Sequence, residues 1–459
     1  MKPQRVLLFL AAVVAALASM ALVAPDEGVS LAGVHLRYPT MSSVLATASK
    51  EEPAPMDTAS VLELSESAHL RDSVNYYNRL TNNGPLRFWF PSASYLDRFW
   101  HTVEQARRSG RTVRILHYGD SQIEMDHITS RLRSYMQNTF GGGGPGMVPA
   151  STLVPSPTYT ISSSGSLTHL ASFGDSTTVR SRNNYGPMMQ SFRMNGNATI
   201  NVRTSHRTNV DDRTKRFTSV KLIYNNLGGS VRATLDSTFT THQAGISSFS
   251  WKTDSLDRFR MRVNGHADLY CMLVDAGPGV AVDNIPMRGC SGHQFTLVNA
   301  ERLTAAYSQM DVGMIILQFG GNSVPYIRTT QAVSKYSKAI GEQIDHLHRS
   351  CPGVPIIFVG PSDMSKSING RMQTYPILPE LVDSLIATAL DHNAAYWSIY
   401  HAMGGQNSMP EWKRQGLAGS DYIHFSQRGA DLMGDRLAEA FDNSYTLYKL
   451  RRRLMKTKR

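Results

Sequence analysis

The chain has 459 residues, 41% hydrophobic and 18% charged, a composition that can bury a full core and excludes a fibrous or disordered protein. Three cysteines are too few for a disulfide framework, and no Cys/His spacing typical of a zinc site occurs. The formal net charge of +11 comes without a nucleic-acid recognition motif, which argues against a nucleic-acid partner.

The N-terminus has the pattern of an export signal. Lys2 and Arg5 precede an uncharged apolar run from Val6 to Ala24. Because this run is almost long enough to span a bilayer, residues 1–24 are predicted to be a signal peptide or an uncleaved membrane anchor. We therefore expect the protein in the periplasm or cell envelope. Residues 25–90, which begin rich in Ala, Ser and Pro, are predicted to form a linker and N-terminal extension.

Residues 91–150 read as helix, strand, tight turn and helix. Apolar residues recur at helical spacing from Tyr95 to Ala106, and the run from Val113 to Tyr118 predicts a buried strand. A second helix should follow and stop near the glycines at 141–144. The turn between strand and helix holds Ser121, at the carboxyl edge of the predicted sheet, where α/β proteins place ligands.

Residues 151–282 have a different texture. They are rich in Ser, Thr, Asn, Gly and Arg, with short alternating runs such as Thr199 to Arg203 and Ser219 to Tyr224. Short strands separated by turn residues predict a β-sandwich or jelly roll. We interpret this block as an insertion into an α/β domain.

The α/β texture returns over residues 283–445. Apolar strands from Val312 to Gln318 and from Val354 to Val359 alternate with helical segments, which indicates a parallel sheet covered on both faces. The final residues, 446–459, form a basic tail. Such a tail can bind an anionic glycan or membrane surface, or it can be a solvated helix end.

Three residues supply the groups needed for acyl transfer. Ser121 is the predicted nucleophile, and Asp421 and His424 stand three positions apart before a helix that Ser426 should cap. On that turn the carboxylate can orient the imidazole toward Ser121. Each feature alone has a simpler explanation, since serine is a common helix N-cap and a lone histidine is often structural.

Oxyanion donors are predicted at Gly292, Asn322 and the backbone amide of Ser121. Asn322 follows a strand and two glycines, which let its side-chain amide approach a reacting carbonyl. Cys290 resembles a nucleophile by position, but a small packed residue is the preferred reading. Glu124, Asp126 and His127 resemble a ligand cluster, although a solvated first helical turn explains them better.

Taken together, these motifs resemble the SGNH, or GDSL, hydrolase superfamily. Gly119-Asp120-Ser121 matches its first block, Gly292 its second, Asn322 its third, and Asp421 with His424 its Asp-x-x-His block. The resemblance covers about 91–150 and 283–445 and implies a flavodoxin-like, three-layer parallel sheet. It also implies a serine esterase that requires no metal or organic cofactor.

Similar exported members of the superfamily remove O-acetyl groups from peptidoglycan or other polysaccharides, so an acylated polysaccharide is the expected substrate. Tyr185, Tyr224 and Trp251 of the insert can stack on sugar rings, but core positions are the preferred reading. The alternatives are an O-acetyltransferase, a lipase or small-ester esterase, and a non-catalytic glycan-binding or envelope-assembly protein. The sequence does not set the oligomeric state.

Overall fold

The structure is a computed structural model that describes residues 3–23, 29–31, 34–36, 58–151, 154–174, 185–236, 238–242 and 246–456. Contacts divide the chain into two units, Met1–His69 and Leu70–Arg459. The first unit contains helix α1 (Pro3–Val23) and an antiparallel pair of strands, β1 (Val29–Leu31) and β2 (Val34–Leu36). Among the helices described here, none is both long and apolar enough to cross a membrane.

Six strands form the central sheet of the second unit, in the order β12-β4-β13-β14-β17-β3. Neighbours from β12 to β17 are parallel, and only β3 runs antiparallel to its neighbour. The strands are β3 (Phe88–Trp89), β4 (Thr112–Gly119), β12 (Gly279–Pro286), β13 (Val312–Gln318), β14 (Ile356–Gly360) and β17 (Ala395–Ser398). Their apolar side chains point alternately to two faces, so the sheet is buried on both.

Helices cover both faces and make the three-layer α/β fold that was predicted. One core contains residues of α4, α5 and α11, including Trp100, Leu132 and Phe441. The other contains residues of α6, α7 and α8. The helices are α4 (Asp97–Ala106), α5 (Thr129–Phe140), α6 (Ala300–Tyr307), α7 (Thr330–Ser350), α8 (Leu378–Asp391), α9 (Ile399–Met403), α10 (Ser408–Arg414) and α11 (Gln427–Lys456).

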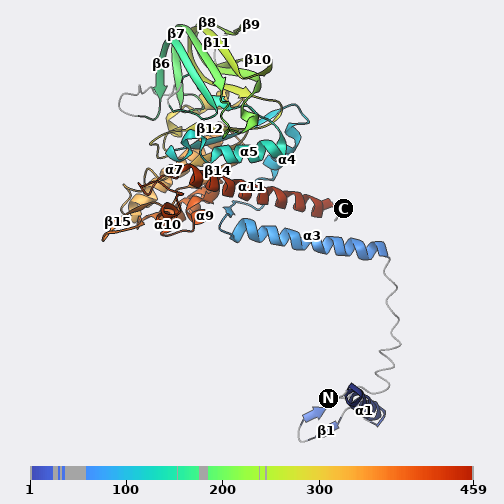
Figure 1. Ribbon diagram of the computed structural model, residues 1–459. Helices are drawn as coiled ribbons and strands as arrows, with labels where there is room; N and C mark the ends of the chain where they lie inside the picture. Colours follow the sequence, from blue (N-terminus) through green and yellow to red (C-terminus); the bar gives the residue numbers. More distant parts are fainter. Residues whose placement is uncertain are drawn as a thin grey trace. The chain divides into compact units, whose positions relative to one another are not determined.

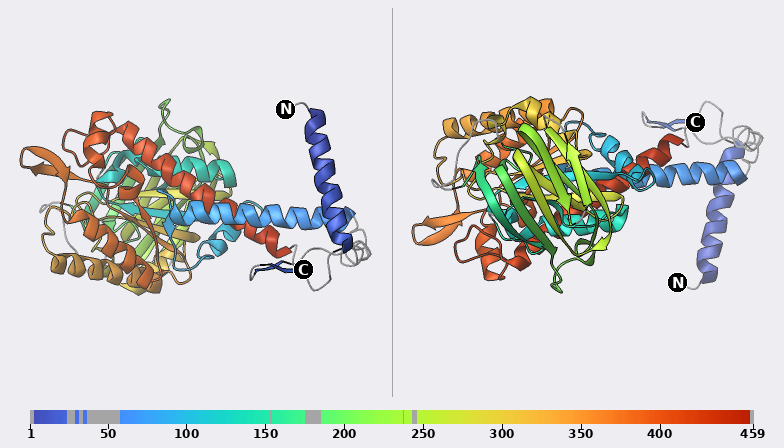
Figure 2. Two further views of the ribbon diagram at one scale, coloured as in Figure 1. Left: turned by 90° about the horizontal axis from the view of Figure 1, so that it is seen from below. Right: turned by 90° about the horizontal axis from the view of Figure 1, so that it is seen from above.

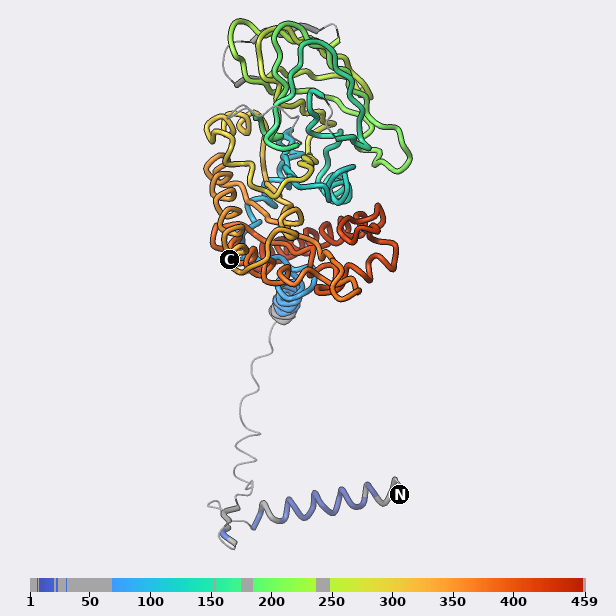
Figure 3. The backbone as a smooth tube through the Cα atoms, turned by 90° about the vertical axis from the view of Figure 1, so that its left-hand side faces the viewer, coloured from blue at the N-terminus to red at the C-terminus, as the bar shows by residue number. Residues whose placement is uncertain are grey.

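The insert is one antiparallel sheet at one end of this unit (Figures 1 and 3). Its central order is β10-β8-β11-β7-β6, with β5 paired to β11 and β9 paired to β8. Register shifts near Gly165 and Gly265 interrupt the long strands, as β-bulges do. The strands are β5 (Gly146–Val148), β6 (Tyr159–Ala171), β7 (Gln190–Thr204), β8 (Phe217–Leu235), β9 (Thr238–His242), β10 (Ile246–Leu256) and β11 (Arg258–Asp275).

The boundaries of the insert differ from the prediction of 151–282. Strand β5 lies before residue 151 but pairs with β11, whereas β12 begins at Gly279 and pairs with β4 of the central sheet. The chain therefore crosses between the two sheets at Gly277-Pro278-Gly279, a glycine–proline turn that the prediction placed inside the insert.

Two flanking predictions also need correction. Helix α3 (Thr58–Asn83) occupies much of the predicted linker over 25–90, with Leu70 and Val74 buried at helical spacing. Residues 37–57 of that linker lie outside the described part. Residues 446–456 of the basic segment are no separate tail, because α11 continues to Lys456 and its residue Arg451 pairs with Asp97, while residues 457–459 lie outside the described part. The interpretation as a helix end is the correct one.

The described residues also contain three short 3₁₀ helices: η1 (Ser121–Asp126), η2 (Asp212–Thr214) and η3 (Phe295–Leu297). η1 directly follows β4, and η2 lies in the insert between β7 and β8. Strands β15 (Ser365–Ile368) and β16 (Arg371–Thr374) form an antiparallel hairpin, whose first amide donates to the Tyr422 carbonyl (3.1 Å). The hairpin is thereby tied to the loop that carries Asp421 and His424.

Candidate active site

Ser121 lies directly after β4, where the chain turns into η1. Asp120 caps η1 by accepting a hydrogen bond of 3.0 Å from the Gln122 amide. A Cβ at Gly119 would lie 3.0 Å from the Ile123 side chain and 3.2 Å from the Gln318 carbonyl oxygen, so only glycine fits this turn without displacement. The Ser121 hydroxyl therefore stands at the carboxyl edge of the sheet, the position expected from the sequence.

Ser121, His424 and Asp421 form a continuous hydrogen-bonded chain. The distance from Ser121 Oγ to His424 Nε2 is 2.8 Å, and that from His424 Nδ1 to Asp421 Oδ2 is 2.7 Å. The three residues come from two segments 300 positions apart, and the turn before α11 brings them together. This arrangement matches the relation of nucleophile, base and orienting carboxylate in acyl-transfer enzymes.

Asp421 is held as an anion by the loop on which it lies. Partial burial acts to raise its pKa, but hydrogen bonds from the His424 side chain and from the amides of Ile423 and His424 outweigh that effect. The pKa of Asp421 is therefore lowered. Its Oδ1 accepts from those two amides at 3.0 and 3.1 Å, which leaves Oδ2 facing the imidazole. An anionic partner on Nδ1 favours Nε2 as the proton acceptor toward Ser121.

Gln122 joins the two halves of the site, a role that the sequence analysis missed. Its Nε2 donates to the Ile423 carbonyl (2.8 Å) and to Ser362 Oγ (3.3 Å), while its Oε1 accepts from the Phe425 amide at 3.4 Å. The residue after the nucleophile thus fixes the residues on both sides of His424. Only its place beside Ser121 could have drawn attention to it.

The predicted oxyanion donors lie around the same edge. Gly292 has a φ of +88°, and a Cβ there would lie 3.0 Å from the Phe319 side chain, so its turn requires glycine. Within the described residues, the amides of Ser121 and Gly292 make no hydrogen bond to another group. They therefore stay available to a ligand.

Asn322 is already engaged in this structure. Its Nδ2 donates to the Cys290 carbonyl (3.0 Å) and to Asp120 Oδ2 (3.2 Å). Asn322 thereby connects the nucleophile turn to the loop that carries Gly292. To bind an oxyanion as predicted, it would have to release one of these acceptors.

Asp120 is a buried carboxyl with an altered affinity for protons. Burial raises its pKa to about 6, while hydrogen bonds from the Gln122 amide and the Asn322 side chain and the nearby His424 act to lower it. The protonation of Asp120 is thus coupled to the position of Asn322 and of the nucleophile turn.

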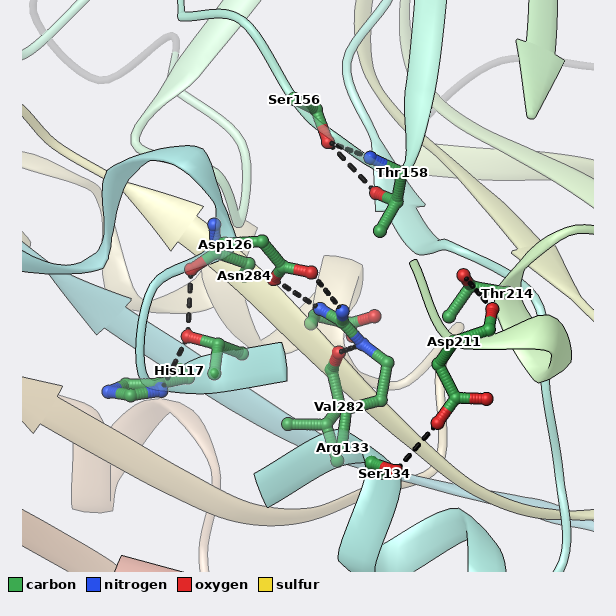
Figure 4. A network of polar contacts seen from close by, with 12 residues as sticks. His117, Asp126, Arg133, Ser134, Ser156, Thr158, Asp211, Thr214, Val282 and Asn284 are labelled. Atoms are coloured by element: carbon green, nitrogen blue, oxygen red, sulfur yellow. Dashed lines mark hydrogen bonds and ion pairs between the residues drawn. The ribbon is translucent and has the colours of Figure 1, made fainter. Parts of the chain in front are cut away.

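The turn after Ser121 is stabilised by two ion pairs with buried carboxylates, which corrects both interpretations of the group formed by Glu124, Asp126 and His127. The pair of Asp126 with Arg133 is buried and is drawn in Figure 4, whereas Arg288, the partner of Glu124, is 70% exposed. Asp126 forms a bidentate pair with Arg133, and Glu124 forms one with Arg288. Both carboxylates are buried, so this is neither a solvated helical turn nor a ligand cluster. Met125, Asp126 and Ile128 all have positive φ, a conformation that costs free energy and needs such support.

A neutral histidine lies beneath this turn. His117 on β4 is fully buried, and desolvation lowers its pKa to about 4. Its Nδ1 is 3.0 Å from Thr129 Oγ1, which donates to Asn284 Oδ1 at 2.9 Å (Figure 4). Its Nε2 is 3.1 Å from Gln318 Oε1. This polar chain connects β4, α5, β12 and β13 behind the nucleophile.

Several other readings of the sequence are settled by burial. Cys290 is buried, as a packed residue should be, and no cysteine of the chain forms a disulfide. Tyr185, Tyr224 and Trp251 are buried, so these rings are core residues and present no stacking surface for sugars. In the part of the chain that the structure describes, no group of three or more His, Cys, Asp or Glu side chains is placed to hold a metal ion.

Residues 250–432 match the model of the GDSL-like Lipase/Acylhydrolase family. The match includes Gly292, Asn322, Asp421 and His424. It begins after Ser121, but the fold places Ser121 within hydrogen-bonding distance of His424. No curated protein matches the chain.

The fold is similar to that of a peptidoglycan O-acetylesterase, with 20% identity, a TM-score of 0.66, and coverage of 78% of this chain and 99% of that chain. A family two carbohydrate esterase from Clostridium thermocellum in complex with cellohexaose has 11% identity and a TM-score of 0.27, over 63% of this chain and 100% of that chain. The lipopolysaccharide acetyltransferase periplasmic domain from Salmonella ser. Paratyphi A has 15% identity and a TM-score of 0.26, over 36% and 73%. Only the first likeness is close enough to indicate a shared fold.

Proposed function

Since the chain carries a GDSL/SGNH lipase-acylhydrolase domain and is an ester-hydrolysing enzyme, we propose that it is an exported serine esterase that removes O-acetyl groups from a cell-envelope polysaccharide. The hydrogen-bonded chain from Ser121 through His424 to Asp421 carries the proposal. We assign no role in substrate binding to the lysines and arginines of the basic C-terminal segment, because some of them form ion pairs within the fold.

In the first half-reaction, Ser121 Oγ attacks the carbonyl carbon of the acetyl ester. His424 Nε2, 2.8 Å away, takes the hydroxyl proton, and the Asp421 carboxylate stabilises the imidazolium that forms. The negative charge on the carbonyl oxygen is stabilised by the amides of Ser121 and Gly292, and by Asn322 if it releases one of its acceptors. His424 then gives its proton to the sugar oxygen, which leaves, and the acetyl group stays on Ser121.

In the second half-reaction, water attacks the acetyl–Ser121 ester with His424 again as the base. Acetate leaves and Ser121 regains its proton. The side chain of His424 is 47% exposed and that of Asp421 is 46% exposed, so water reaches this site. Water can therefore act as the acceptor of the acetyl group.

Two observations support the choice of substrate. The fold is similar to that of a peptidoglycan O-acetylesterase, and the basic and apolar pattern of residues 1–24 is typical of export. Whether that segment is cleaved or stays as an anchor does not change the chemistry of the site.

The test is acetate release by the full chain from O-acetylated peptidoglycan and from acetylated xylan. Ser121→Ala should lower the rate by about 10⁴- to 10⁶-fold, since loss of the nucleophile leaves only binding and oxyanion stabilisation. Ser130→Ala, a change of the same kind on α5, serves as the control and should stay within a few-fold of the parent. An unchanged rate in Ser121→Ala would refute the proposal.

The same assay distinguishes the alternatives. If acetyl groups were transferred to an added oligosaccharide at a higher rate than free acetate was released, the protein would be a transferase. Release from a small aryl acetate without release from either polymer would identify a small-ester esterase. A folded parent that binds polymer and turns over neither polymer nor aryl ester would identify a glycan-binding protein without catalysis.

A further inference from the structure

One face of the insert carries five arginines, which we call the arginine face. Strand β11 alternates Arg258, Arg260 and Arg262 with buried apolar residues, so the three guanidinium groups project from the same side. Cross-strand pairing adds the other two, because Arg258 pairs with Arg203 of β7 and Asn264, two residues beyond Arg262, pairs with Arg232 of β8. Figure 2 shows these neighbouring strands side by side, seen from above in the right-hand view.

These arginines are exposed and poorly neutralised. All five belong to the exposed class, and among the described residues no ion pair includes Arg203, Arg232, Arg260 or Arg262. Two acids lie nearby. Asp257 is 3.7 Å from Arg258 but also 3.0 Å from His206, and Asp236 accepts from a backbone amide of β11 at 3.3 Å. The face therefore keeps a clear excess of positive charge.

Between the guanidinium groups stands an ordered set of amides and hydroxyls. Arg260 Nε donates to Asn201 Oδ1 (3.0 Å), and Asn201 Nδ2 donates to Ser162 Oγ (3.3 Å). Farther along, Asn264 Nδ2 donates to Asn197 Oδ1 at 2.7 Å. An open groove of about 890 Å³ lies over this part of the sheet. Its polar lining includes Thr160, Ser162, Asn201, Arg203, Arg258, Arg260, Arg262 and Asp236.

The spacing suits an extended ligand with repeated charges. Alternate residues of a strand are about 6.6 Å apart, since each residue advances by about 3.3 Å, so Arg258 and Arg262 lie about 13 Å apart. The row of arginines therefore extends over a distance that a ligand with repeated charges can follow. A linear polymer lying across the sheet can contact several arginines, while the amides and hydroxyls bind its hydroxyl groups.

The side chains of the arginine face favour some classes of polyanion over others. The exposed large hydrophobic residues in the described part of the chain include none from β6, β7, β8 or β11, so the face has no side chain to insert into a lipid bilayer. It also offers no exposed aromatic ring for stacking nucleic-acid bases. Guanidinium groups alternating with amides and hydroxyls fit sugars that carry carboxylates.

We propose that the arginine face binds a linear carboxylate-bearing polysaccharide. The proposal depends on the insert alone and stands apart from the catalytic role of Ser121. If the proposed esterase function also holds, the face keeps the polymer near the catalytic domain and raises its local concentration there.

The test uses the full chain with Ser121→Ala, so that binding is measured without catalysis. The probe is polygalacturonate, and uncharged pullulan is its neutral counterpart. The Ser121→Ala chain should bind polygalacturonate and should not bind pullulan. Its affinity for polygalacturonate should fall steeply as the salt concentration rises. Substitution of Arg203, Arg258 and Arg262 by Gln should weaken binding on the order of tenfold, since each exposed charge contributes modestly. Arg260 is kept because it donates to Asn201.

The control replaces three exposed cations of α7, Lys335, Lys338 and Arg349, by Gln, which removes the same charge from the catalytic domain. It should change binding less than twofold. Equal loss in both triple variants would overturn the proposal, because net charge would then explain the binding. So would tighter, arginine-dependent binding to anionic phospholipid vesicles or to single-stranded DNA.

A second variant tests the face without removing any arginine, in case the triple substitution disturbs folding. Thr160→Glu with Ser162→Glu adds negative charge to exposed positions paired, through β7, with the same arginines. It should weaken polygalacturonate binding as well, with an unchanged unfolding temperature. Undiminished binding in this folded variant would also overturn the proposal. The same substitutions, made in the chain that keeps Ser121, should lose polygalacturonate binding and still release acetate from a small aryl acetate, which would separate this site from the catalytic one.

Discussion

The two sides of the active site are stabilised differently. The nucleophile turn rests on buried charges, since Asp126 and its partner Arg133 are 3% exposed each. The loop with Asp421 and His424 is half exposed and is held by hydrogen bonds to backbone atoms and to Gln122. The nucleophile is therefore fixed by the core and the base by a surface loop. Changes on the first side should appear mainly in stability and changes on the second mainly in rate.

The largest effect is expected from His424→Ala. Removal of the base should lower kcat for a small aryl acetate by about 10³- to 10⁶-fold, because Ser121 then has no proton acceptor. The free energy of unfolding should change little, since the ring is half exposed. His127→Ala, which removes a neighbouring imidazole bonded to Gln427, is the control and should keep most activity. A large loss of stability in His424→Ala would contradict the comparison.

The opposite behaviour is expected from Arg133→Met. It leaves the Asp126 carboxylate buried without its partner, and such a change costs about 3–5 kcal/mol of unfolding free energy. Arg131→Met on the same helix removes an exposed pair with Asp435 and should cost no more than about 1 kcal/mol. Urea denaturation of both variants measures the difference. Equal costs would show that the nucleophile turn does not depend on buried charge.

Asp120 provides a test by pH on the buried side. Its folded pKa of about 6 lies above the unfolded value of about 3.9, so the folded state binds the proton more tightly and stability falls as pH rises from about 4 to 6. Relative to the parent, Asp120→Asn should therefore gain up to about 3 kcal/mol between pH 4 and pH 8. Subtracting the two unfolding curves removes the contribution of other groups, such as Asp275. If the difference in unfolding free energy between the two proteins stayed constant or shrank from pH 4 to pH 8, the raised pKa of Asp120 would be contradicted.

The sequence predicted the elements that depend on local pattern. Strand β13 is an apolar run, β4 is mostly apolar with Arg114 and His117 buried within it, and the helices that cover them have apolar residues at helical spacing. Ser121, His424 and Asp421 were predicted from motifs to act together, and the fold brings them within hydrogen-bonding distance. The alternating runs of the insert predicted short strands in a β-sandwich or jelly roll; the strands are present, but they pair in a single antiparallel sheet.

The interpretation of charged residues failed where the partner lies far away in the chain. Nothing near Glu124 reveals that Arg288, 164 positions later, will cover it, so a charged turn was taken as solvated. The end of the insert was missed for a similar reason, since β12 joins the central sheet through its register with β4. Long-range pairing decides these cases, and local composition does not encode it.

Gln122 is the clearest example of such a contact and gives the smallest expected effect. Its amide bonds to Ile423, 301 positions later, and so connects the fixed nucleophile turn to the exposed loop. Gln122→Met preserves the length of the side chain but removes these hydrogen bonds, which should let His424 move and lower kcat by about 10- to 100-fold with KM unchanged. Gln122→Glu keeps the acceptor for the Phe425 amide and should lose less activity. If the residue only stabilised the fold, both variants would unfold more easily at unchanged kcat. A loss of kcat at constant stability would instead show that the two sides act together only because Gln122 joins them.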